Sequence, residues 1–537
     1  MPKDTKTAWY SWYVLIVLTL VYLCSMIDRH VITILAPYIK SDLGITDAQI
    51  GLLYGTAFAL FYGLFGIPLA KLADCWSRTK TIALSLCFWT AMTTVSGFSS
   101  NFVQLSLARI GVGIGEAAAS PAAVSLIGDY FPKSKRGTAL AIYAMSITIG
   151  AGVALVIGGA IVAAWQLHYP PGVRAPFGLS AWQAVFIAVG LPGFVLALLV
   201  RVSIREPIRG VLEGLPMPLS TRPLAAVLSE LETMIPPWSL VALCRGRHFR
   251  AAWVNVAALM SLIVFAILIT RATDNLLAVA RRPIIFRLGD YAVTSNVVQW
   301  SAMAAASYAF LSWIQAIRSR DNVSHRLVAG NRNFMILALT CSFMSISLYS
   351  INSFNFIYGV RYVGLGPRDG AMLGSIAMIF GAAGMLLAGV LGDHWRRKNP
   401  AGRTYLCIGS FAAATVSILI QYSTTSPKVF FICWVFTSTF IIMWSPLVNA
   451  TIQDLVLPRM RGLGLAVSAF GSSLGLGLGP YTVGLISDVT SNLRFAVLST
   501  IAFTAPISIL ALIYLARVLP SDEASLVSRA RAAGEPV

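Results

Sequence analysis

Charged side chains are scarce in this sequence. They make up 11% of the 537 residues, whereas a soluble domain carries about a quarter. Acids are the scarcer sign, since 21 Asp and Glu residues stand against 40 Lys and Arg. Cysteine (7) and histidine (5) are also few and scattered, so the sequence offers no disulfide framework and no ligand spacing typical of a metal site. We expect neither a metal nor a cofactor.

Long apolar runs take the place of the missing charges. Hydrophobic residues make up 57% of the chain, and apolar windows long enough to cross about 30 Å of hydrocarbon recur along nearly its whole length. The run that starts at Trp9 is too long for a signal peptide. The sequence therefore predicts an all-α polytopic membrane protein. The fourteen predicted spans are 10–36, 48–73, 79–98, 102–128, 137–165, 181–203, 250–271, 295–316, 333–359, 368–392, 402–422, 427–450, 461–487 and 493–517.

The net charge of +19 follows from the distribution of basic residues between the spans. With both termini in the cytoplasm, most Lys and Arg fall on the cytoplasmic side, which is the positive-inside pattern. We therefore expect a multi-pass protein of the inner (plasma) membrane and no nucleic-acid partner. Four arginines (271, 281, 282 and 287) break the pattern between 250–271 and 295–316. A segment lying in the membrane interface around 275–288 is the alternative there.

The spans divide into two sets of six with an insert between them. Residues 1–203 are predicted to form an N-terminal six-helix bundle, and residues 333–517 a C-terminal one. Between them, 204–332 contains polar, proline-containing linkers and the extra apolar pair. The last segment, 518–537, is short and polar, and we expect it to be a disordered cytoplasmic tail.

Two loop motifs recur in the two halves. "LADCWSRTK" is echoed by "LGDHWRRKN", and "DYFPKSKRG" by "DLVLPRMRG". The alignment pairs Asp74 with Asp393, Arg78 with Arg397, and Asp129 with Asp454, at nearly the same sequence separation. A duplicated six-helix unit explains both pairs. Parallel repeats of this kind build transporters whose binding site lies between the halves, near the middle of the bilayer.

The first of these motifs resembles the signature of the major facilitator superfamily. The second-half copy matches it with Gly389, Asp393, Arg396 and Arg397, while the first copy departs from it with Ala70 and Cys75. Residues 28–74 and 108–143 resemble the spinster-like branch of the superfamily. The resemblance implies two six-helix bundles and export of lysophospholipids or sphingoid lipids. Symporters of sugar acids and other organic anions share the Asp-Arg and Gly-Glu-Ala motifs, so they remain the nearest rival.

Ionisable residues inside the spans are the strongest functional candidates, because each costs about 2.5–3.5 kcal/mol at a helix centre unless it has a partner or a wet cavity. Asp28, Arg29 and His30 interrupt the first span, and Arg109 and Glu116 lie on one face of the fourth. At about 1.5 Å per residue, Arg109 reaches nearly the depth of Asp28. The cluster either only holds helices together or handles protons and an anion.

The chemistry of these side chains suggests their roles. Desolvation favours the protonated form of a carboxyl group, so Asp28 and Glu116 are the candidate proton-coupling residues. Guanidinium groups suit phosphate or carboxylate, so Arg29 and Arg109 are candidate substrate ligands. His30 is interpreted as a packing residue with a smaller chance of a functional role.

The second half of the sequence contains uncharged candidates for substrate binding, and the loops contain candidate gating residues. The candidate substrate-binding residues there are Tyr349, Asn352, Asn355 and Trp444. For the two asparagines, hydrogen bonding between helices is the alternative. The candidate gating residues at the helix ends, where Asp and Arg can pair across a loop, are Asp74, Arg78, Asp393 and Arg397.

These residues together predict a secondary transporter that works by alternating access. Its expected substrate is an amphipathic lipid exported with proton coupling, and the alternative is a small organic anion taken up with protons. Partners beyond the substrate, protons and membrane lipids are not indicated, and the oligomeric state is left open. No catalytic constellation is visible, so an enzyme is not expected. A non-transporting receptor or scaffold is a further alternative.

Overall fold

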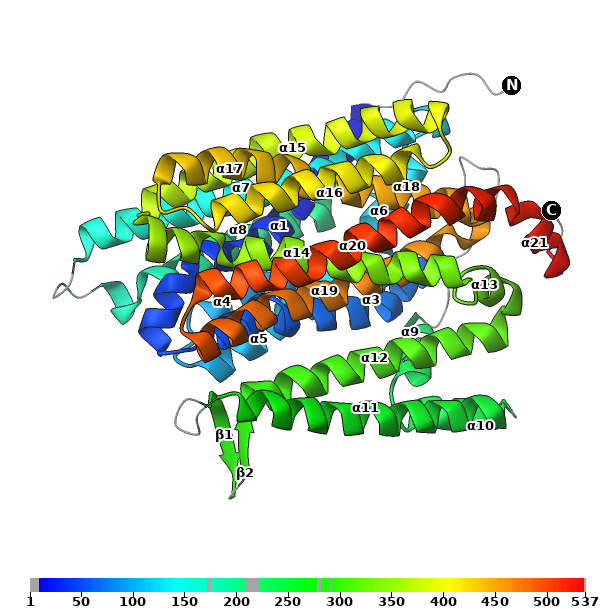
Figure 1. Cartoon of the computed structure of the whole chain (residues 1–537), viewed down its shortest axis with the longest axis horizontal. Helices are drawn as coiled ribbons and strands as arrows, with labels where there is room; N and C mark the ends of the chain where they lie inside the picture. Colours follow the sequence, from blue (N-terminus) through cyan, green and yellow to red (C-terminus); the bar gives the residue numbers. More distant parts are fainter. Residues whose placement is uncertain are drawn as a thin grey trace. The chain divides into compact units, whose positions relative to one another are not determined.

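The computed structural model describes residues 9–170, 173, 175–208, 223–246, 248–277, 282–289 and 291–535, and nearly all of them are helical (Figure 1). The first half contains α1 (Trp9–Leu43), α2 (Asp47–Tyr54), α3 (Thr56–Cys75), α4 (Arg78–Ser96), α5 (Phe102–Glu116), α6 (Ala119–Tyr130), α7 (Lys133–His168) and α8 (Ala181–Ser203). The second contains α14 (Arg332–Tyr358), α15 (Pro367–Lys398), α16 (Gly402–Gln421), α17 (Pro427–Ile441), α18 (Trp444–Leu455), α19 (Arg461–Thr490), α20 (Leu493–Ala524) and α21 (Leu526–Ala532).

The insert between the halves contains the described strands as well as helices. Its elements are α9 (Pro223–Met234), α10 (Trp238–Arg245), α11 (Phe249–Asn275), β1 (Ile284–Leu288), β2 (Tyr291–Thr294), α12 (Ser295–Arg320) and α13 (Asn322–Leu327). The strands pair antiparallel and connect α11 to α12, which run side by side (Figure 1). Residues 284–288 of the segment with the interfacial alternative form β1; whether the segment lies in the membrane interface stays a prediction.

Twelve helices of the described chain are long and apolar enough to cross a membrane, which confirms a polytopic all-α membrane protein. Helices occupy all fourteen predicted positions. However, α4 and α12 are not among the twelve, because their sequences contain more polar residues. The count of fourteen spans is therefore not confirmed and stays a prediction.

The chain forms two compact units, and each takes one segment from the other half of the sequence. Unit 1 comprises Met1–Gly44, Phe61–Leu231 and Gly366–Met378, so it includes the start of α15. Unit 2 comprises Ile45–Leu60, Glu232–Leu365 and Ile379–Val537, so it includes α2.

Glycines allow the close helix contacts that join α2 to unit 2 and the start of α15 to unit 1. In unit 1, a Cβ on Gly152 of α7 would lie 2.5 Å from the carbonyl oxygen of Gly374 in α15. In unit 2, a Cβ on Gly51 of α2 would overlap the backbone of Pro480 in α19. Small residues let helix backbones approach closely in membranes.

Helix α12 attaches the insert to α19 within unit 2. Tyr481 donates a hydrogen bond to Oδ1 of Asn296, and the rings of Phe310 and Phe470 stack with their centroids 3.9 Å apart. By contrast, α11 has only 17% of its apolar window buried. The apolar side chains that α11 leaves exposed suit contact with lipid tails.

The C-terminal segment differs from the prediction of a disordered tail. Helix α20 continues to Ala524 and α21 follows to Ala532. Contacts with earlier elements hold this segment, because Asp522 accepts a hydrogen bond from the Asn333 side chain (2.8 Å) and Glu523 pairs with Arg396. These contacts could not be predicted from the local composition of the segment, because their partners are more than a hundred residues away in the sequence.

Candidate functional site

A cluster of buried charges lies inside unit 1, where α1 faces α5. Asp28, Arg109 and Glu116 are each at most 1% exposed. The guanidinium of Arg29 donates from Nη2 to Oε2 of Glu116 at 2.9 Å. The guanidinium of Arg109 donates from Nη1 to the backbone oxygen of Asp28 at 3.1 Å. The structure therefore brings together the four charged residues that the sequence singled out.

The Asp28 carboxylate is the least satisfied group in this cluster. Neither of its oxygens has a hydrogen-bond partner among the described residues. Trp89 and Thr93 of α4 lie beside it, and their Nε1 and Oγ1 atoms are buried and likewise lack partners. Burying an ionised carboxylate without such bonds is costly. Binding of a proton, or a small shift of α4 that brings these donors into hydrogen-bond geometry, would remove that cost.

Arg29 is in contact with aromatic as well as acidic groups. Its guanidinium carbon lies 4.7 Å from the centroid of the Tyr62 ring, and its side chain is 15% exposed. A guanidinium that pairs with Glu116 on one side and stacks on an aromatic ring is held in a fixed orientation. His30 is buried at 9% exposure beside this pair.

In unit 2, the predicted uncharged candidates fall into two groups. Asn355 is 3% exposed and accepts a hydrogen bond from Gln421 (2.9 Å), which in turn accepts one from Thr437 (3.0 Å). This arrangement corresponds to the helix–helix alternative for Asn355. Tyr349 and Asn352 are half-buried, and Trp444 is buried with its Nε1 unpartnered in the described chain.

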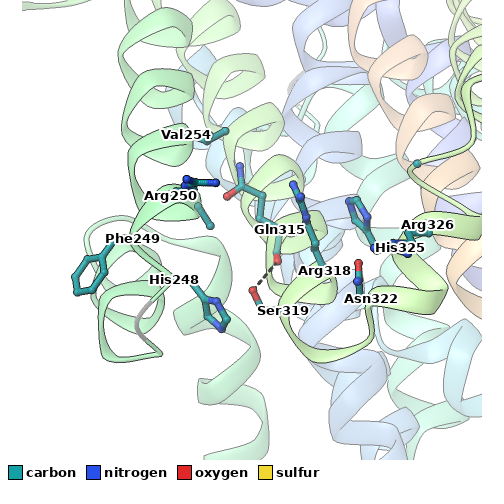
Figure 2. A pocket seen from close by; sticks show the side chains of 12 residues that line it. His248, Phe249, Arg250, Val254, Gln315, Arg318, Ser319, Asn322, His325 and Arg326 are labelled. Atoms are coloured by element: carbon teal, nitrogen blue, oxygen red, sulfur yellow. Dashed lines mark hydrogen bonds between the residues drawn. The ribbon is translucent and has the colours of Figure 1, made fainter. Parts of the chain in front are cut away.

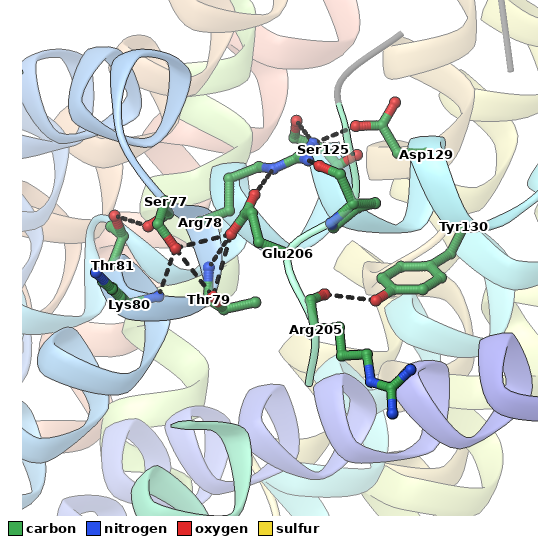
Figure 3. A network of polar contacts seen from close by, with 11 residues as sticks. Ser77, Arg78, Thr79, Lys80, Thr81, Ser125, Asp129, Tyr130, Arg205 and Glu206 are labelled. Carbon is green, nitrogen blue, oxygen red and sulfur yellow. Dashed lines mark hydrogen bonds and ion pairs between the residues drawn. The ribbon is translucent and has the colours of Figure 1, made fainter. Parts of the chain in front are cut away.

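Arg78 organises a polar network in unit 1 (Figure 3). Its guanidinium is fully buried and donates to Glu206 Oε1 (2.8 Å), to Asp129 Oδ2 (2.5 Å) and to Ser125 Oγ (2.9 Å). The Asp74 side chain lies outside the described part of the structure. Sequence reasoning did not single out Glu206, which follows the end of α8, as a partner.

The donors around Glu206 decide its charge state. Burial raises the pKa of this carboxyl, but hydrogen bonds from the Thr79 backbone N–H, the Arg78 guanidinium and the Ser77 hydroxyl outweigh burial and leave the pKa below its ordinary value. Glu206 is therefore an anion at neutral pH. The network joins the start of α4 to the chain that follows α8.

A second copy of this network lies in unit 2, and it corrects the predicted register. Arg403 donates to Asp454 Oδ2 at 2.5 Å, and this pair spans 51 positions, as does the pair of Arg78 with Asp129. Arg403 also bonds Asp393 at 2.7 Å. Arg397 is exposed and makes no ion pair with any described residue. Arg403 is thus the counterpart of Arg78, because α15 continues to Lys398, well beyond Asp393, whereas α3 ends at Cys75, directly after Asp74.

A third charged group, which sequence reasoning missed, lies at the start of α2 in unit 2. The Asp47 carboxylate is buried and receives two bonds from Arg361 (2.7 and 2.6 Å) and one from Ser487 (2.7 Å). Asp488 accepts the backbone N–H groups of Asp47 and Ala48 (3.0 and 2.8 Å), which caps α2. We call these four residues (Asp47, Arg361, Ser487 and Asp488) the Asp47 clasp. An acid at the first position of a helix was its only signal in the sequence.

The membrane-spanning helices and the repeated charged network define a polytopic membrane protein with two related halves. The sequence profile of the Major Facilitator Superfamily matches residues 18–401 and 335–536. The chain belongs to this superfamily.

Individual relatives are similar over part of the chain. The probable L-galactonate transporter of Escherichia coli (strain K12) is 31% identical over 172 residues, which is 32% of this chain and 34% of the relative. Protein spinster homolog 1 of Xenopus laevis is 28% identical over 213 residues, 38% of this chain and 37% of the relative. The chain thus matches between a third and two fifths of the length of these relatives.

A solved structure is similar over nearly the whole chain. The bacterial homologue of the human lysosomal transporter Spinster, in an inward-facing and unoccupied conformation, superposes with a TM-score of 0.66 at 23% identity. The match covers 98% of this chain and 99% of that one. At this identity, the similarity establishes the fold.

Proposed function

We propose that this protein is a secondary active transporter that exports an anionic amphipathic lipid, such as a lysophospholipid or a phosphorylated sphingoid lipid, by proton-coupled alternating access. Membership of the superfamily supports transport, and the spinster relatives support the branch. The termini would lie in the cytoplasm and the protein in the inner (plasma) membrane, as the distribution of Lys and Arg indicates.

The pairing of Arg29 with Glu116 is the observation that carries the proposal. A phosphate or carboxylate that binds Arg29 competes with Glu116 for the same guanidinium. Glu116 would then lose its partner in a buried site, and taking up a proton would remove the cost of the unpaired charge. Anion binding and proton binding are thereby linked at one residue.

Asp28 provides a second proton site for the cycle. Its carboxylate has no described hydrogen-bond partner, so it gains more from a proton than a paired carboxylate does. Arg109 donates to the backbone oxygen of the same residue, and a guanidinium carries five N–H donors, so the proposal places a second substrate oxygen against it. The cycle would alternate between a protonated state and an anion-bound state.

The apolar part of the substrate needs a separate surface. The second half offers half-buried aromatic and amide side chains at Tyr349 and Asn352 and the buried indole of Trp444, but no ionised residue among the predicted candidates. A charged half and an uncharged half suit a molecule with an ionic head and an apolar tail. The rival substrate, a small organic anion, is favoured by the likeness to the probable L-galactonate transporter.

A chain-length series separates the two substrates. Each buried methylene contributes about 0.8 kcal/mol, so four more carbons should raise affinity more than about 100-fold. We would measure competitive binding of lysophospholipids with short to long acyl chains, each below its micelle concentration. The variant Arg29→Gln should weaken every member of the series by a similar factor, because it removes only the head-group contact.

The matched control is Arg397→Gln, which removes an exposed charge that forms no ion pair with described residues. It should leave the series unchanged. A flat chain-length profile combined with tight binding of a hexonate would refute the lipid assignment and favour the organic anion.

A further inference from the structure

A basic cavity opens in unit 2 where α11, α12 and α13 meet (Figure 2). Its volume is about 1070 Å³. Eight polar residues line it: His248, Arg250, Gln315, Arg318, Ser319, Asn322, His325 and Arg326. Figure 2 shows Arg250 of α11 and Gln315 and Arg318 of α12 on facing helices, with His325 and Arg326 of α13 beside them. None of these residues belongs to the Asp28 cluster, and none was a candidate from the sequence.

No acid that the structure describes forms an ion pair with the arginines of this cavity. No acid is among the lining residues, and the three lining arginines form no ion pair with any residue that the structure describes. The neighbouring acid, Asp321, is already engaged by Arg459 at 2.8 Å and by Ser324. The Arg459 hydrogen bond lowers the pKa of Asp321 to about 2, so its charge is committed to that contact.

Two further observations indicate a positive potential in the cavity. Burial and the neighbouring charge of Arg318 lower the pKa of His325, and a nearby anion would have the opposite effect. The N-terminus of the 27-residue helix α11 also opens here, and no side chain caps it at His248. Its free N–H groups and helix dipole add positive potential.

A buried polar group in the wall is also without a partner. The Oε1 atom of Gln315 is buried and has no hydrogen bond within the described chain. Its side-chain amide lies between Arg250 and Arg318 (Figure 2). A ligand with both phosphate oxygens and hydroxyl groups would satisfy this amide and the guanidinium groups together.

We propose that this cavity binds the phosphate of an anionic phospholipid headgroup. The volume exceeds what a single phosphate needs and is in the upper range of ligand pockets, which suits a glycerol-bearing headgroup. Phe249 and Val254 line the same cavity, and the adjacent Trp253 of α11 is 74% exposed. These apolar side chains continue onto the lipid-facing surface of α11, where acyl chains would lie. The bound lipid holds α11 against α12 and α13.

The test compares two sources of phosphate on the purified full-length protein. Thermal melting and native mass spectrometry would follow addition of phosphatidylglycerol, phosphatidylcholine with the same acyl chains, or inorganic phosphate at matched ionic strength. Phosphatidylglycerol should raise the melting temperature and leave one retained lipid per chain, and the other two should do neither. The double variant Arg250→Gln/Arg318→Gln should weaken phosphatidylglycerol binding at least about tenfold, because two charged hydrogen bonds are lost.

The control variant removes the same charge from the opposite end of the insert. Arg271→Gln/Arg287→Gln changes two exposed arginines outside the cavity and should bind the lipid as the wild type does. Arg318→Lys retains the charge and should keep most of the binding. Equal losses in both double variants, or equal protection by phosphatidylcholine, would overturn the proposal. Protection by inorganic phosphate alone, with no further effect of lipid, would overturn the headgroup assignment.

Discussion

Replacing Arg78 should destabilise the protein far more than replacing its counterpart Arg403, although both form a 2.5 Å bond to an aspartate. Arg78 is 1% exposed, and its partners Asp129 and Glu206 are 16% and 22% exposed. Arg78→Gln therefore leaves two neighbouring carboxylates mostly buried and without their shared cation. Breaking a buried ion pair by removing one partner costs about 3–5 kcal/mol.

The surroundings of Arg403 make its loss less costly. Its side chain is 17% exposed, its partner Asp393 is 64% exposed, and its partner Asp454 keeps Arg396 at 3.7 Å. Water and Arg396 would compensate the two carboxylates, so we expect a cost of about 1 kcal/mol or less. A cooperative unit of about 150–250 residues shifts by roughly 2–4 °C per kcal/mol. Arg78→Gln should then lower the melting temperature by roughly 6–20 °C, and Arg403→Gln by less than about 4 °C.

The assay is thermal melting in detergent, followed by tryptophan fluorescence and repeated across pH. Glu206 has a lowered pKa in the folded protein, so its stabilising contribution is complete above the pKa of the unfolded chain and is lost as pH falls through the folded value. Between pH 7 and about pH 3.5, the wild type should therefore lose more stability than Glu206→Gln. Equal effects of Arg78→Gln and Arg403→Gln would refute the reasoning from burial, and identical pH profiles would refute the role of Glu206.

Two further predictions concern the buried carboxyl groups of unit 1 and the Asp47 clasp of unit 2. Asp28→Asn and Glu116→Gln should remain folded and lose the pH dependence of transport in proteoliposomes, because they remove the two buried carboxyl groups; wild-type pH profiles in both would mean that the cluster is only structural. Arg361→Gln should loosen the Asp47 clasp and speed amide hydrogen exchange in α2 about tenfold, since a buried charged partner is lost. The control is Arg287→Gln, which changes an exposed arginine and should leave hydrogen exchange in α2 unchanged. An equal rise in the exchange rate in this control would exclude a specific role for the clasp.

The class of this protein could be predicted from the sequence because the signals are local. Apolar length and composition determine which segments are long enough to cross a membrane, and the described residues contain twelve such helices. The duplicated motifs indicated two related halves. The charged residues within the spans also stood out, because each is too costly to retain in lipid without a partner. Asp28, Arg29, Arg109 and Glu116 were found in this way.

The choice of partners depended on tertiary structure. Arg78 bonds Glu206, which is 128 positions away, and Arg361 bonds Asp47 across 314 positions. Arg403, and not Arg397, takes the role of Arg78, because α15 extends further beyond its aspartate than α3 does, and this shifts the start of the next helix. Asn355 accepts a hydrogen bond from Gln421 of another helix, 66 positions away. Composition marks a buried polar residue as costly, but only the packing of distant segments determines which group compensates it.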